Sequence, residues 1–229
     1  MTKDCEFLMR VCKAAAEIIT DEFVVHAKDD KGDLVTNFDF EVEKFIIAEI
    51  KKEYPGFDII SEELNPTGKL TENCFTVDPI DGTINFAHGL PLWGIQVACV
   101  RGGKTVAAVI YLPKLNEMYC ADKNGAFCNG KKISVNNLAP EKGLFAGIKP
   151  AEHPNRNCNR QIYCAALCFS WVAAGRLGAA FIAICPAWDV VPGKYLVEQA
   201  GGFGEIISAG FTVANSKKYL EFIKKECIK

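Results

Sequence analysis

Asp78 and Asp81 lie three residues apart, and their types and spacing suit the binding of a metal ion. They follow the apolar run 74–77, which predicts a short buried strand, and Gly82 and Thr83 come directly after them. A strand that ends in acids and turns through Asp-Gly can direct several oxygens at one point, and hard cations such as Mg²⁺ prefer oxygen ligands. Glycine lets the backbone approach a ligand closely, and a helix that starts after the turn would offer free N–H groups to a phosphate. This stretch therefore indicates a metal-assisted phosphate site.

Acids also follow other apolar segments of the chain. Glu62 and Glu63 follow the predicted strand 57–60, Asp189 follows a later apolar run, and Asp39 stands in the first turn of a predicted helix. Acids at the ends of strands and helices are usually solvated or act as caps, and for Asp189 alone this interpretation has equal weight. The Asp-Pro-Ile-Asp motif is different, because two acids that enclose a proline and an isoleucine fit poorly in a plain surface turn.

The elements that must position these acids follow from apolar periodicity and turn signals. The runs 93–101 and 104–112, joined by Gly102-Gly103, predict a hairpin, and further turn residues predict an antiparallel meander over 93–135. Before the meander, the sequence predicts a helix over 4–22 and a second helix capped by Thr36 or Asn37 and stopped by Tyr54-Pro55-Gly56. A strand over 117–122 belongs to the meander, and a strand over 143–148 and a polar loop over 149–159 follow it. The remaining predicted elements are a buried helix over 161–175, a strand over 181–185, a helix over 190–200, a strand over 203–207 and a last helix from a cap at Asn215 or Ser216 through Cys227.

The composition is that of a soluble globular protein. The chain of 229 residues suits one large domain or two small ones. Its formal net charge is -2, so it lacks the basic field that nucleic-acid binders carry. The apolar run 161–175 ends at Arg176 and is shorter than a membrane-spanning helix, which needs about 20 residues. The 11 cysteines include no Cys-x-x-Cys pair and mostly lie in apolar runs, which predicts buried free thiols and a cytoplasmic location.

Two long motifs resemble the signatures of the inositol monophosphatase family, the Mg²⁺-dependent, lithium-sensitive sugar phosphatases. The first is Asp78-Pro79-Ile80-Asp81-Gly82-Thr83-Ile84-Asn85-Phe86, and the second is Trp188-Asp189-Val190-Val191-Pro192-Gly193 running to Glu198-Gln199-Ala200-Gly201-Gly202. Segments 33–39, 60–63 and 125–130 are similar to the family as well, at family-like spacings. The resemblance covers residues 5 to 228, in order.

This resemblance implies a site for two or three Mg²⁺ ions. The metal ligands that it implies are Glu62, Asp78, the carbonyl of Ile80, Asp81 and Asp189. The catalytic residues that it implies are Thr83, which would help to position the attacking water, Asp39, which would orient Thr83, and Glu62. The substrate and phosphate ligands that it implies are Asp81, Gly82, Thr83, Ala165 and Asp189, with phosphate on the N–H groups of Gly82 and Thr83.

The physics of the residues agrees with these roles. Closely spaced carboxylates repel one another unless cations lie between them. Paired Mg²⁺ ions lower the pKa of a water molecule and stabilise a leaving oxygen, which leaves the protein little covalent work. The sequence offers no Cys/His or Ser/His arrangement for covalent catalysis, and His26, His88 and His153 are scattered along it.

Two positions depart from the inositol-specific pattern of the family. Ile182 stands where a glutamate would contact the inositol ring, and Cys164 stands where a Thr or Ser precedes an Ala-Ala pair. An isoleucine cannot form hydrogen bonds with substrate hydroxyls, so the sequence allows a substrate other than free inositol phosphate. The predicted reaction is hydrolysis of a small polyol or sugar phosphate monoester by metal-activated water. Fructose-1,6-bisphosphate and histidinol phosphate are the alternatives, and nucleotide 3′-phosphates rank last because that branch usually has Lys-Glu where Ile84-Asn85 stands.

The elements and the resemblance together predict an α/β layered fold of αβαβα type, with a large, mostly antiparallel sheet and a smaller mixed α/β part. We expect residues 1–149 to carry the main metal site and residues 150–229 to contribute Asp189. The resemblance also implies a homodimer, for which the hairpin 93–112 would be an interface, and no nucleic-acid or membrane partner is expected. An alternative of another class is an inactive metal- or phosphate-binding regulatory protein, which the complete set of acids argues against.

Overall fold

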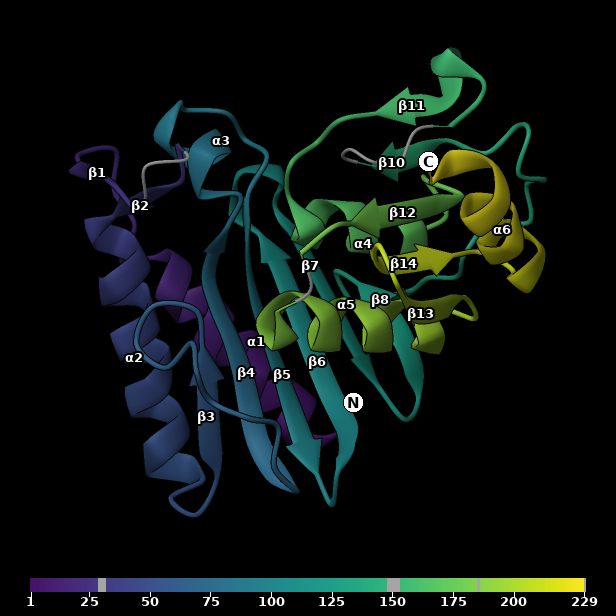
Figure 1. Ribbon diagram of the computed structural model, residues 1–229. Helices are drawn as coiled ribbons and strands as arrows, with labels where there is room; N and C mark the ends of the chain where they lie inside the picture. The colour runs from purple at the N-terminus through teal and green to yellow at the C-terminus, as the bar shows by residue number, and fades with distance from the viewer. Residues whose placement is uncertain (29–31, 148–152, 185, 229) are drawn as a thin grey trace.

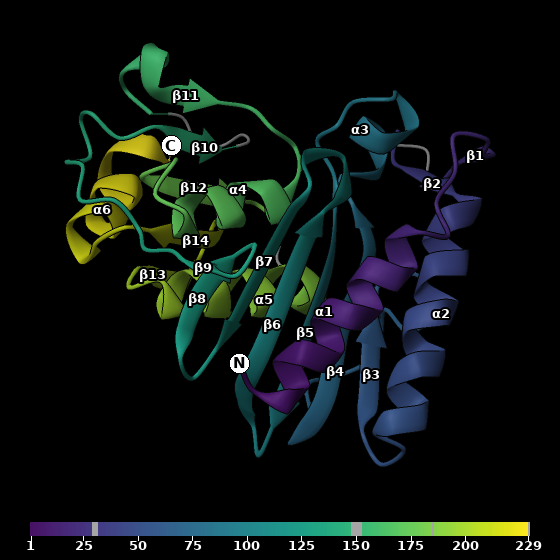
Figure 2. The ribbon, with the colours of Figure 1, turned by 180° about the vertical axis from the view of Figure 1, so that it is seen from behind.

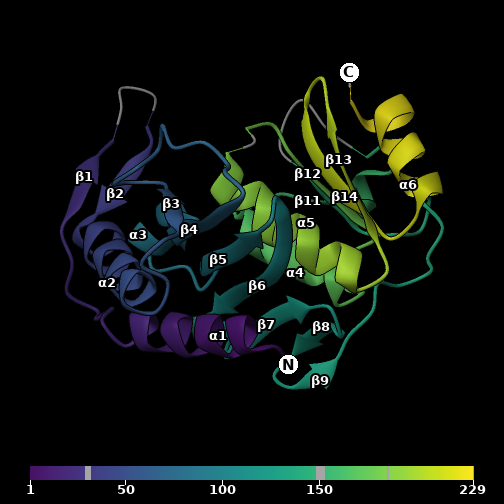
Figure 3. The same cartoon turned by 90° about the horizontal axis from the view of Figure 1, so that it is seen from below.

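The computed structural model describes residues 1–28, 32–147, 153–184 and 186–228, which form alternating layers of helices and sheets (Figure 1). The first layer holds α1 (Lys3–Ala16) and α2 (Asn37–Glu53). The central helical layer holds α4 (Ala165–Ala173) and α5 (Ala187–Gln199), and α6 (Lys217–Phe222) covers the far side (Figure 3). A sheet lies in each of the two gaps between these helical layers. The predicted αβαβα fold is therefore confirmed.

The large sheet lies between α1 and α2 on one face and the central helices on the other (Figure 2). Within the described residues it has seven strands in the order β3-β4-β5-β6-β7-β8-β9, and every neighbouring pair is antiparallel except β3 and β4. The strands are β3 (Asp58–Ser61), β4 (Asn73–Asp81), β5 (Gly94–Arg101), β6 (Lys104–Leu112), β7 (Glu117–Asp122), β8 (Gly125–Cys128) and β9 (Lys131–Lys132). The predicted meander is confirmed. Gly102 and Gly103, with φ of 57° and 71°, form its first turn, because a type I′ hairpin needs positive φ at both positions.

The hairpin of β5 and β6, the predicted dimer interface, is largely covered by helices. It lies in the middle of the sheet, where α1 packs on one face and α5 on the other. The residues of β5 are buried up to Val100. The described residues of the hairpin therefore offer little free surface beyond the turn at 101–104, and a dimer contact there stays a prediction.

The parallel pair β3 and β4 brings two acidic strand ends to the same edge of the sheet. Ser61 pairs with Val77, so Glu62 follows β3 beside the point where Asp78 stands on β4. The acids do not follow β4, as the apolar run predicts, but belong to it, because the strand continues to Asp81. Its pairing with β5 shifts register between Asp78 and Asp81. Pro79 explains the irregularity, since it has no N–H to donate to the ladder.

The smaller sheet is mixed and has the strand order β11-β10-β12-β14-β13 among the described residues. Its strands are β10 (Phe145–Gly147), β11 (Asn159–Arg160), β12 (Ala179–Ile182), β13 (Phe203–Ile207) and β14 (Gly210–Ala214). The strand predicted over 203–207 is confirmed, whereas β12 begins earlier than predicted and β14 has no counterpart in the prediction. A separate hairpin of β1 (Val25–Ala27) and β2 (Leu34–Thr36) was not predicted either. The predicted domain boundary at 149–150, the end of the strand over 143–148 and Cys185 lie outside the described residues.

The helices differ from the prediction mainly at their ends. Helix α1 stops at Ala16 rather than 22, where the β-branched Ile18, Ile19 and Thr20 disfavour the helix. The buried helix predicted over 161–175 begins only at Ala165, after a cap at Cys164. The last helix is capped by Ser216 and ends in a π-helical turn at Ile223–Cys227. No described helix has the length and apolar character that a membrane span requires.

Buried apolar side chains fill each interface between layers. One cluster joins α1 and α2 to the large sheet, a second joins the large sheet to α4, α5 and the smaller sheet, and a third joins the smaller sheet to α6. Representative members are Leu8, Ile46 and Val97 in the first cluster, Ile110, Phe169 and Phe211 in the second, and Phe145, Phe181 and Tyr219 in the third. The packing of these layers fixes the strand and helix ends that carry the acids.

Candidate metal and phosphate site

Carboxyl groups from two distant parts of the chain converge at one point. Asp78 and Asp81 come from the end of β4, and Asp189 comes from the first turn of α5. One carboxylate oxygen of each lies within 4.8 Å of the others, a spacing at which a single cation can contact all three. Asp189 is not at a strand end, because the helix predicted from Val190 begins at Ala187.

Burial makes this acid cluster electrostatically costly. Asp78 is 1% exposed, and its Oδ1 has no hydrogen-bond partner among the described residues. Burial, followed by the negative charges of Glu62, Asp81 and Asp189, raises the pKa of Asp78 well above its usual value. Burial and then the charge of Asp81 raise the pKa of Asp189 in the same way. An unpaired buried carboxylate oxygen beside other acids fits a bound cation, and an all-oxygen donor set fits Mg²⁺.

Asp81 is held by the beginning of α4. Its Oδ2 accepts the backbone N–H of Ala166 at 2.5 Å and the thiol of Cys164 at 3.0 Å. Burial raises the pKa of Asp81, and these hydrogen bonds act against that rise. The Cys164 Sγ also caps α4 by accepting the N–H of Leu167 at 3.5 Å. The cysteine thus makes the contacts of a hydroxyl cap and helps to fix Asp81, which contributes one oxygen to the cluster.

Gly82 separates the acids from the short helix α3 (Thr83–Ala87). Its φ of 86° is a left-handed conformation that favours glycine. A Cβ at this position would lie 2.9 Å from the carbonyl of Leu92 and 3.2 Å from Cβ of Cys164, so the turn has no room for a side chain. Gly82, Thr83 and Ala165 all line the cavity beside the acids.

Thr83 and Asp39 form a hydrogen-bonded pair next to this turn. The hydroxyl of Thr83 lies 3.1 Å from Asp39 Oδ1 and 2.8 Å from the carbonyl of Ile80. A hydroxyl has one hydrogen, so when Thr83 donates to Asp39 the Ile80 carbonyl remains free to bind a cation. Asp39 is fully buried, and its Oδ2 accepts both the N–H and the hydroxyl of Thr36 at 2.7 and 2.6 Å. Burial raises the pKa of Asp39, although the Thr36 hydrogen bonds lower it.

Glu62 lines the same cavity but is engaged by a lysine. The Lys28 Nζ lies 2.8 Å from Glu62 and 2.5 Å from Glu63. Burial raises the pKa of Glu62 to about 7, even though the charge of Lys28 acts against this. Glu62 therefore stands beside the cluster of Asp78, Asp81 and Asp189, where its carboxylate pairs with Lys28 while its charge still acts on Asp78.

Several residues that the sequence did not indicate support these groups. Glu43 is fully buried on α2, and its two oxygens accept the N–H groups of Glu63 and Leu64 at 2.9 and 2.7 Å. Gln96, also fully buried, pairs with Asp78 across β4 and β5, and its amide nitrogen lies 3.4 Å from Asp189. The sequence features that could have indicated them are an acid on the inward face of α2, for Glu43, and an amide within an apolar strand, for Gln96.

The acids open into a cavity of about 660 Å³. Its polar side is formed by the acids and the turn at Gly82. The rest of its lining is largely apolar and includes Ile84, Tyr163, Ile182 and Ile184. This division suits a ligand with a charged phosphate end and a second part that meets apolar side chains.

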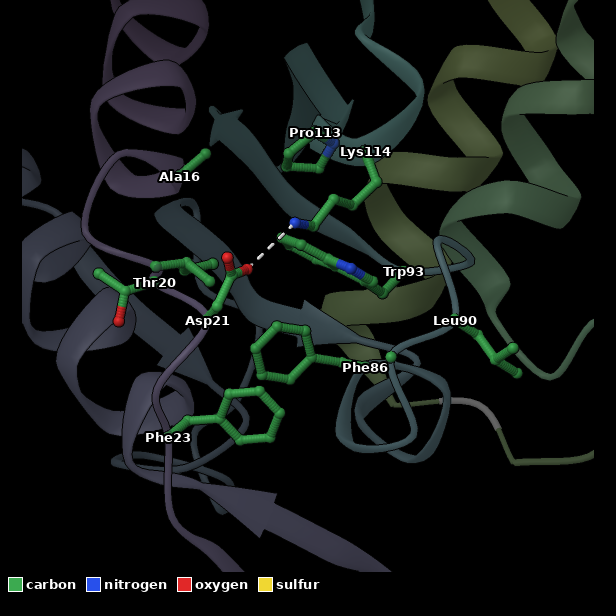
Figure 4. A pocket seen from close by; sticks show the side chains of 11 residues that line it. Ala16, Thr20, Asp21, Phe23, Phe86, Leu90, Trp93, Pro113 and Lys114 are labelled. Atoms are coloured by element: carbon green, nitrogen blue, oxygen red, sulfur yellow. Dashed lines mark ion pairs between the residues drawn. The ribbon is translucent and has the colours of Figure 1, made fainter.

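A second cavity, of about 430 Å³, lies behind α3 and contains none of the predicted site residues (Figure 4). Phe23 stacks on Phe86 with ring centroids 4.7 Å apart, and Phe86 meets the edge of Trp93 at 5.1 Å. An ion pair between Asp21 and Lys114, at 3.7 Å, lies next to these rings. The aromatic packing holds α3, and thereby Thr83, against the large sheet.

The chain resembles known proteins over most of its length. A family model described as the inositol monophosphatase family matches residues 1–220. The inositol-1-monophosphatase of Mesorhizobium japonicum is 34% identical over 197 residues, covering 78% of this chain and 74% of that protein. The fructose-1,6-bisphosphatase/inositol-1-monophosphatase of Thermotoga maritima is 34% identical over 208 residues, covering 86% of this chain and 80% of that protein. The structure of the extragenic suppressor protein suhB from Bartonella henselae matches with a TM-score of 0.84 at 27% identity, covering 97% of this chain and 98% of that one.

Proposed function

The chain belongs to the inositol monophosphatase family, and we propose that it is a Mg²⁺-dependent phosphatase that hydrolyses a small phosphate monoester. The observation that carries the proposal is the convergence of Asp78, Asp81 and Asp189, with an unpartnered oxygen on the most buried of them. Carboxylates this close require positive charge between them, and phosphate hydrolysis requires positive charge around the transferred group.

In this proposal the acids and the carbonyl of Ile80 hold two or three Mg²⁺ ions, with Glu62 as a further ligand once it leaves Lys28. Bound ions of this kind lower the pKa of a water molecule and stabilise the leaving oxygen. Thr83, oriented by its hydrogen bond to Asp39, accepts a hydrogen bond from the attacking water and aligns it. The N–H groups of Gly82 and Thr83 bind the phosphate. Ala165 and Asp189 line the part of the cavity that receives the rest of the substrate.

The alcohol part of the substrate is proposed to be a polyol or sugar. The named activities of the Mesorhizobium and Thermotoga relatives make inositol 1-phosphate and fructose 1,6-bisphosphate the first candidates, and histidinol phosphate is the next. An inactive binding protein is the alternative from another class. The retention of every acid of the cluster, with the Thr83–Asp39 pair intact, favours the enzyme.

A panel of these monoesters, assayed for phosphate release with Mg²⁺ and with a chelator, tests the function. We expect turnover only with Mg²⁺. Asp189→Asn should lower kcat/KM roughly 100-fold, because a shared metal ligand supplies several kcal/mol of transition-state stabilisation. Asp58→Asn, which changes an exposed acid at the far end of β3, is the matched control and should keep full activity. Undiminished hydrolysis by Asp189→Asn would refute the metal assignment.

We also propose four properties on the basis of the family resemblance. These are inhibition by lithium, a cytoplasmic location, a homodimer and the absence of a nucleic-acid partner. Sedimentation of the purified protein tests the dimer, and hydrolysis in the presence of LiCl tests the inhibition.

A further inference from the structure

Exposed apolar side chains gather at the rim of the cavity that holds the acids. Tyr163 is 59% exposed and Ile184 is 78% exposed, and both line this cavity together with the half-exposed Ile84. Single exposed apolar residues are common on protein surfaces, but several around one ligand cavity indicate a surface that a ligand covers. The rim borders the phosphate-binding turn, because Ile84 directly follows Gly82 and Thr83 in the chain.

Tyr163 has an unusual backbone conformation. Its φ is 55°, and the other described non-glycine residues with positive φ are asparagines, Asn116 and Asn129. Asparagine tolerates the left-handed region, whereas a bulky aromatic residue is strained there. Strain of this kind persists where the surrounding structure enforces it, and it is concentrated at functional sites.

The surroundings of Tyr163 show what enforces this conformation. The side-chain amide of Asn85, in α3, donates to the carbonyls of Ile162 and Leu92, both at 2.9 Å. On the other side, Cys164 caps α4 and binds Asp81. The turn at Tyr163 is therefore fixed between two anchors of the site. Glycine or asparagine would adopt the same turn with less strain. The presence of a tyrosine is therefore explained if its aromatic ring contacts a ligand.

The position of the ring relates it to the substrate. Cys164, the next residue, packs against Gly82 of the phosphate-binding turn, where even a Cβ would come within 3.2 Å. Tyr163 therefore directly precedes a residue that contacts the phosphate-binding turn, and it lines the same cavity as that turn. An aromatic face and aliphatic side chains bind a planar ring by stacking and apolar contact, whereas they leave polyol hydroxyls without partners.

We propose that Tyr163 and Ile184 form an apolar lip that binds a planar ring, aryl or heterocyclic, carried by the alcohol part of the substrate. This rests on the proposed phosphatase function, and within it favours esters that carry a planar ring over inositol 1-phosphate and fructose 1,6-bisphosphate, which carry none. The ring takes no part in the chemistry: water adds to phosphorus, the bond from phosphorus to the alcohol oxygen breaks, and that oxygen takes up a proton. The lip raises kcat/KM by holding the alcohol part while this occurs.

Two matched pairs of esters test the lip. Adenosine 5′-monophosphate and ribose 5-phosphate share a primary sugar alcohol and differ in the base, and 2-phenylethyl phosphate and propyl phosphate differ in the phenyl ring. With Mg²⁺ we expect kcat/KM to favour the ring-bearing member in at least one pair, by about 5- to 10-fold, the ratio that one stacking contact supplies.

Substitutions then assign the preference to the lip. Tyr163→Asn keeps a residue that accepts positive φ and should abolish the preference, while Tyr163→Phe keeps the ring and should retain it. Ile184→Ser should reduce it, whereas Ile206→Ser, which removes a similarly exposed isoleucine from β13 outside the cavity, should leave it unchanged. Tyr163→Asn should also unfold at the same temperature as the parent protein or higher, because the strain is relieved.

The outcomes separate the two proposals. Equal turnover of both members of each pair, or a preference that survives in Tyr163→Asn, would overturn the lip and leave the phosphatase standing. No turnover of any ester under saturating Mg²⁺ would overturn the phosphatase, and the lip with it. A marked loss of stability in Tyr163→Asn would show that the tyrosine serves the fold instead.

Discussion

Cys164 makes two contacts that a hydroxyl side chain usually makes at such a position. Its sulfur accepts the N–H of Leu167 as the cap of α4, and its thiol donates to Asp81. One side chain therefore joins the start of a helix to an acid of the candidate metal site. Serine can make both hydrogen bonds, whereas alanine can make neither.

We expect Cys164→Ser to retain stability, and Cys164→Ala to lower the free energy of unfolding by about 1 kcal/mol, the usual cost of a lost N-cap. The alanine variant should also need more Mg²⁺ for half-maximal phosphate release, because Asp81 loses a donor that orients it. Urea unfolding and Mg²⁺ titration of activity measure the two effects. If serine and alanine behave alike in both, the thiol has no such role.

Residues within the family-like motifs could be predicted even where they lie far apart in the chain, whereas residues outside these motifs could not. Asp78, Asp81, Gly82 and Thr83 belong to one turn, so their spacing alone indicates that they act together. Lys28 reaches Glu62 from 34 residues away, and nothing in its local sequence indicates this ion pair. Its contact with Glu62 exists only because the fold brings Lys28, directly after β1, to the end of β3.

At the scale of elements, the loop after β3 depends on a buried acid of α2. The oxygens of Glu43 bind the N–H groups of Glu63 and Leu64, directly after Glu62. Burial raises the pKa of Glu43, although these backbone hydrogen bonds act against the rise. The helix thus fixes the direction in which the end of β3 presents Glu62 to the cavity.

Glu43→Gln should weaken this support, because a glutamine has one acceptor oxygen and cannot bind both N–H groups. We expect the Mg²⁺ concentration for half-maximal activity to rise about 10-fold, as is typical when a residue that orients a metal ligand is lost. Activity at saturating Mg²⁺ should largely recover. Glu53→Gln, on an exposed position of the same helix, is the control. An unchanged Mg²⁺ requirement in Glu43→Gln would show that the loop holds Glu62 without it.

Element types were easier to predict than element ends. The meander of β5 to β9 and the helices α2 and α4 follow from periodicity, whereas α5 begins three residues before the predicted start. Pro186 ends an apolar run, so the pattern predicts a loop there, yet proline is also common where helices begin. This difference moves Asp189 from a strand end into a helical first turn, where backbone N–H groups favour a carboxylate.

At the scale of the whole molecule, the candidate site exists only where layers meet. The large sheet supplies Asp78 and Asp81, the first helical layer supplies Asp39, and the central helical layer supplies Asp189. Apolar patterns predict the layers, but they do not show which strand end faces which helix. The order of the family-like motifs along the chain indicated which segments meet at the site. The packing of the three apolar clusters brings these segments together.

The acid cluster also makes global stability depend on pH. Burial raises the pKa of Glu62 from 4.5 to about 7, and burial with neighbouring charges raises those of Asp78 and Asp189. Between pH 4.5 and about 7, the metal-free folded protein therefore holds more protons than the unfolded chain. Stability falls with rising pH wherever the folded state holds more protons, so the metal-free protein loses stability as the pH rises from 4.5 through about 7.

Bound Mg²⁺ should remove this loss, because it supplies the positive charge that protons supply at lower pH. We expect urea unfolding from about pH 5 to about pH 8 to show declining stability with a chelator and a flatter profile with Mg²⁺, so that stabilisation by Mg²⁺ grows with pH. Asp189→Asn should flatten the chelator profile, since one carboxyl leaves the cluster, whereas Asp58→Asn should not. Stability that rises with pH in the chelator would mean that the carboxyl groups are ionised in the metal-free fold, and that the cluster needs no cation to remain buried.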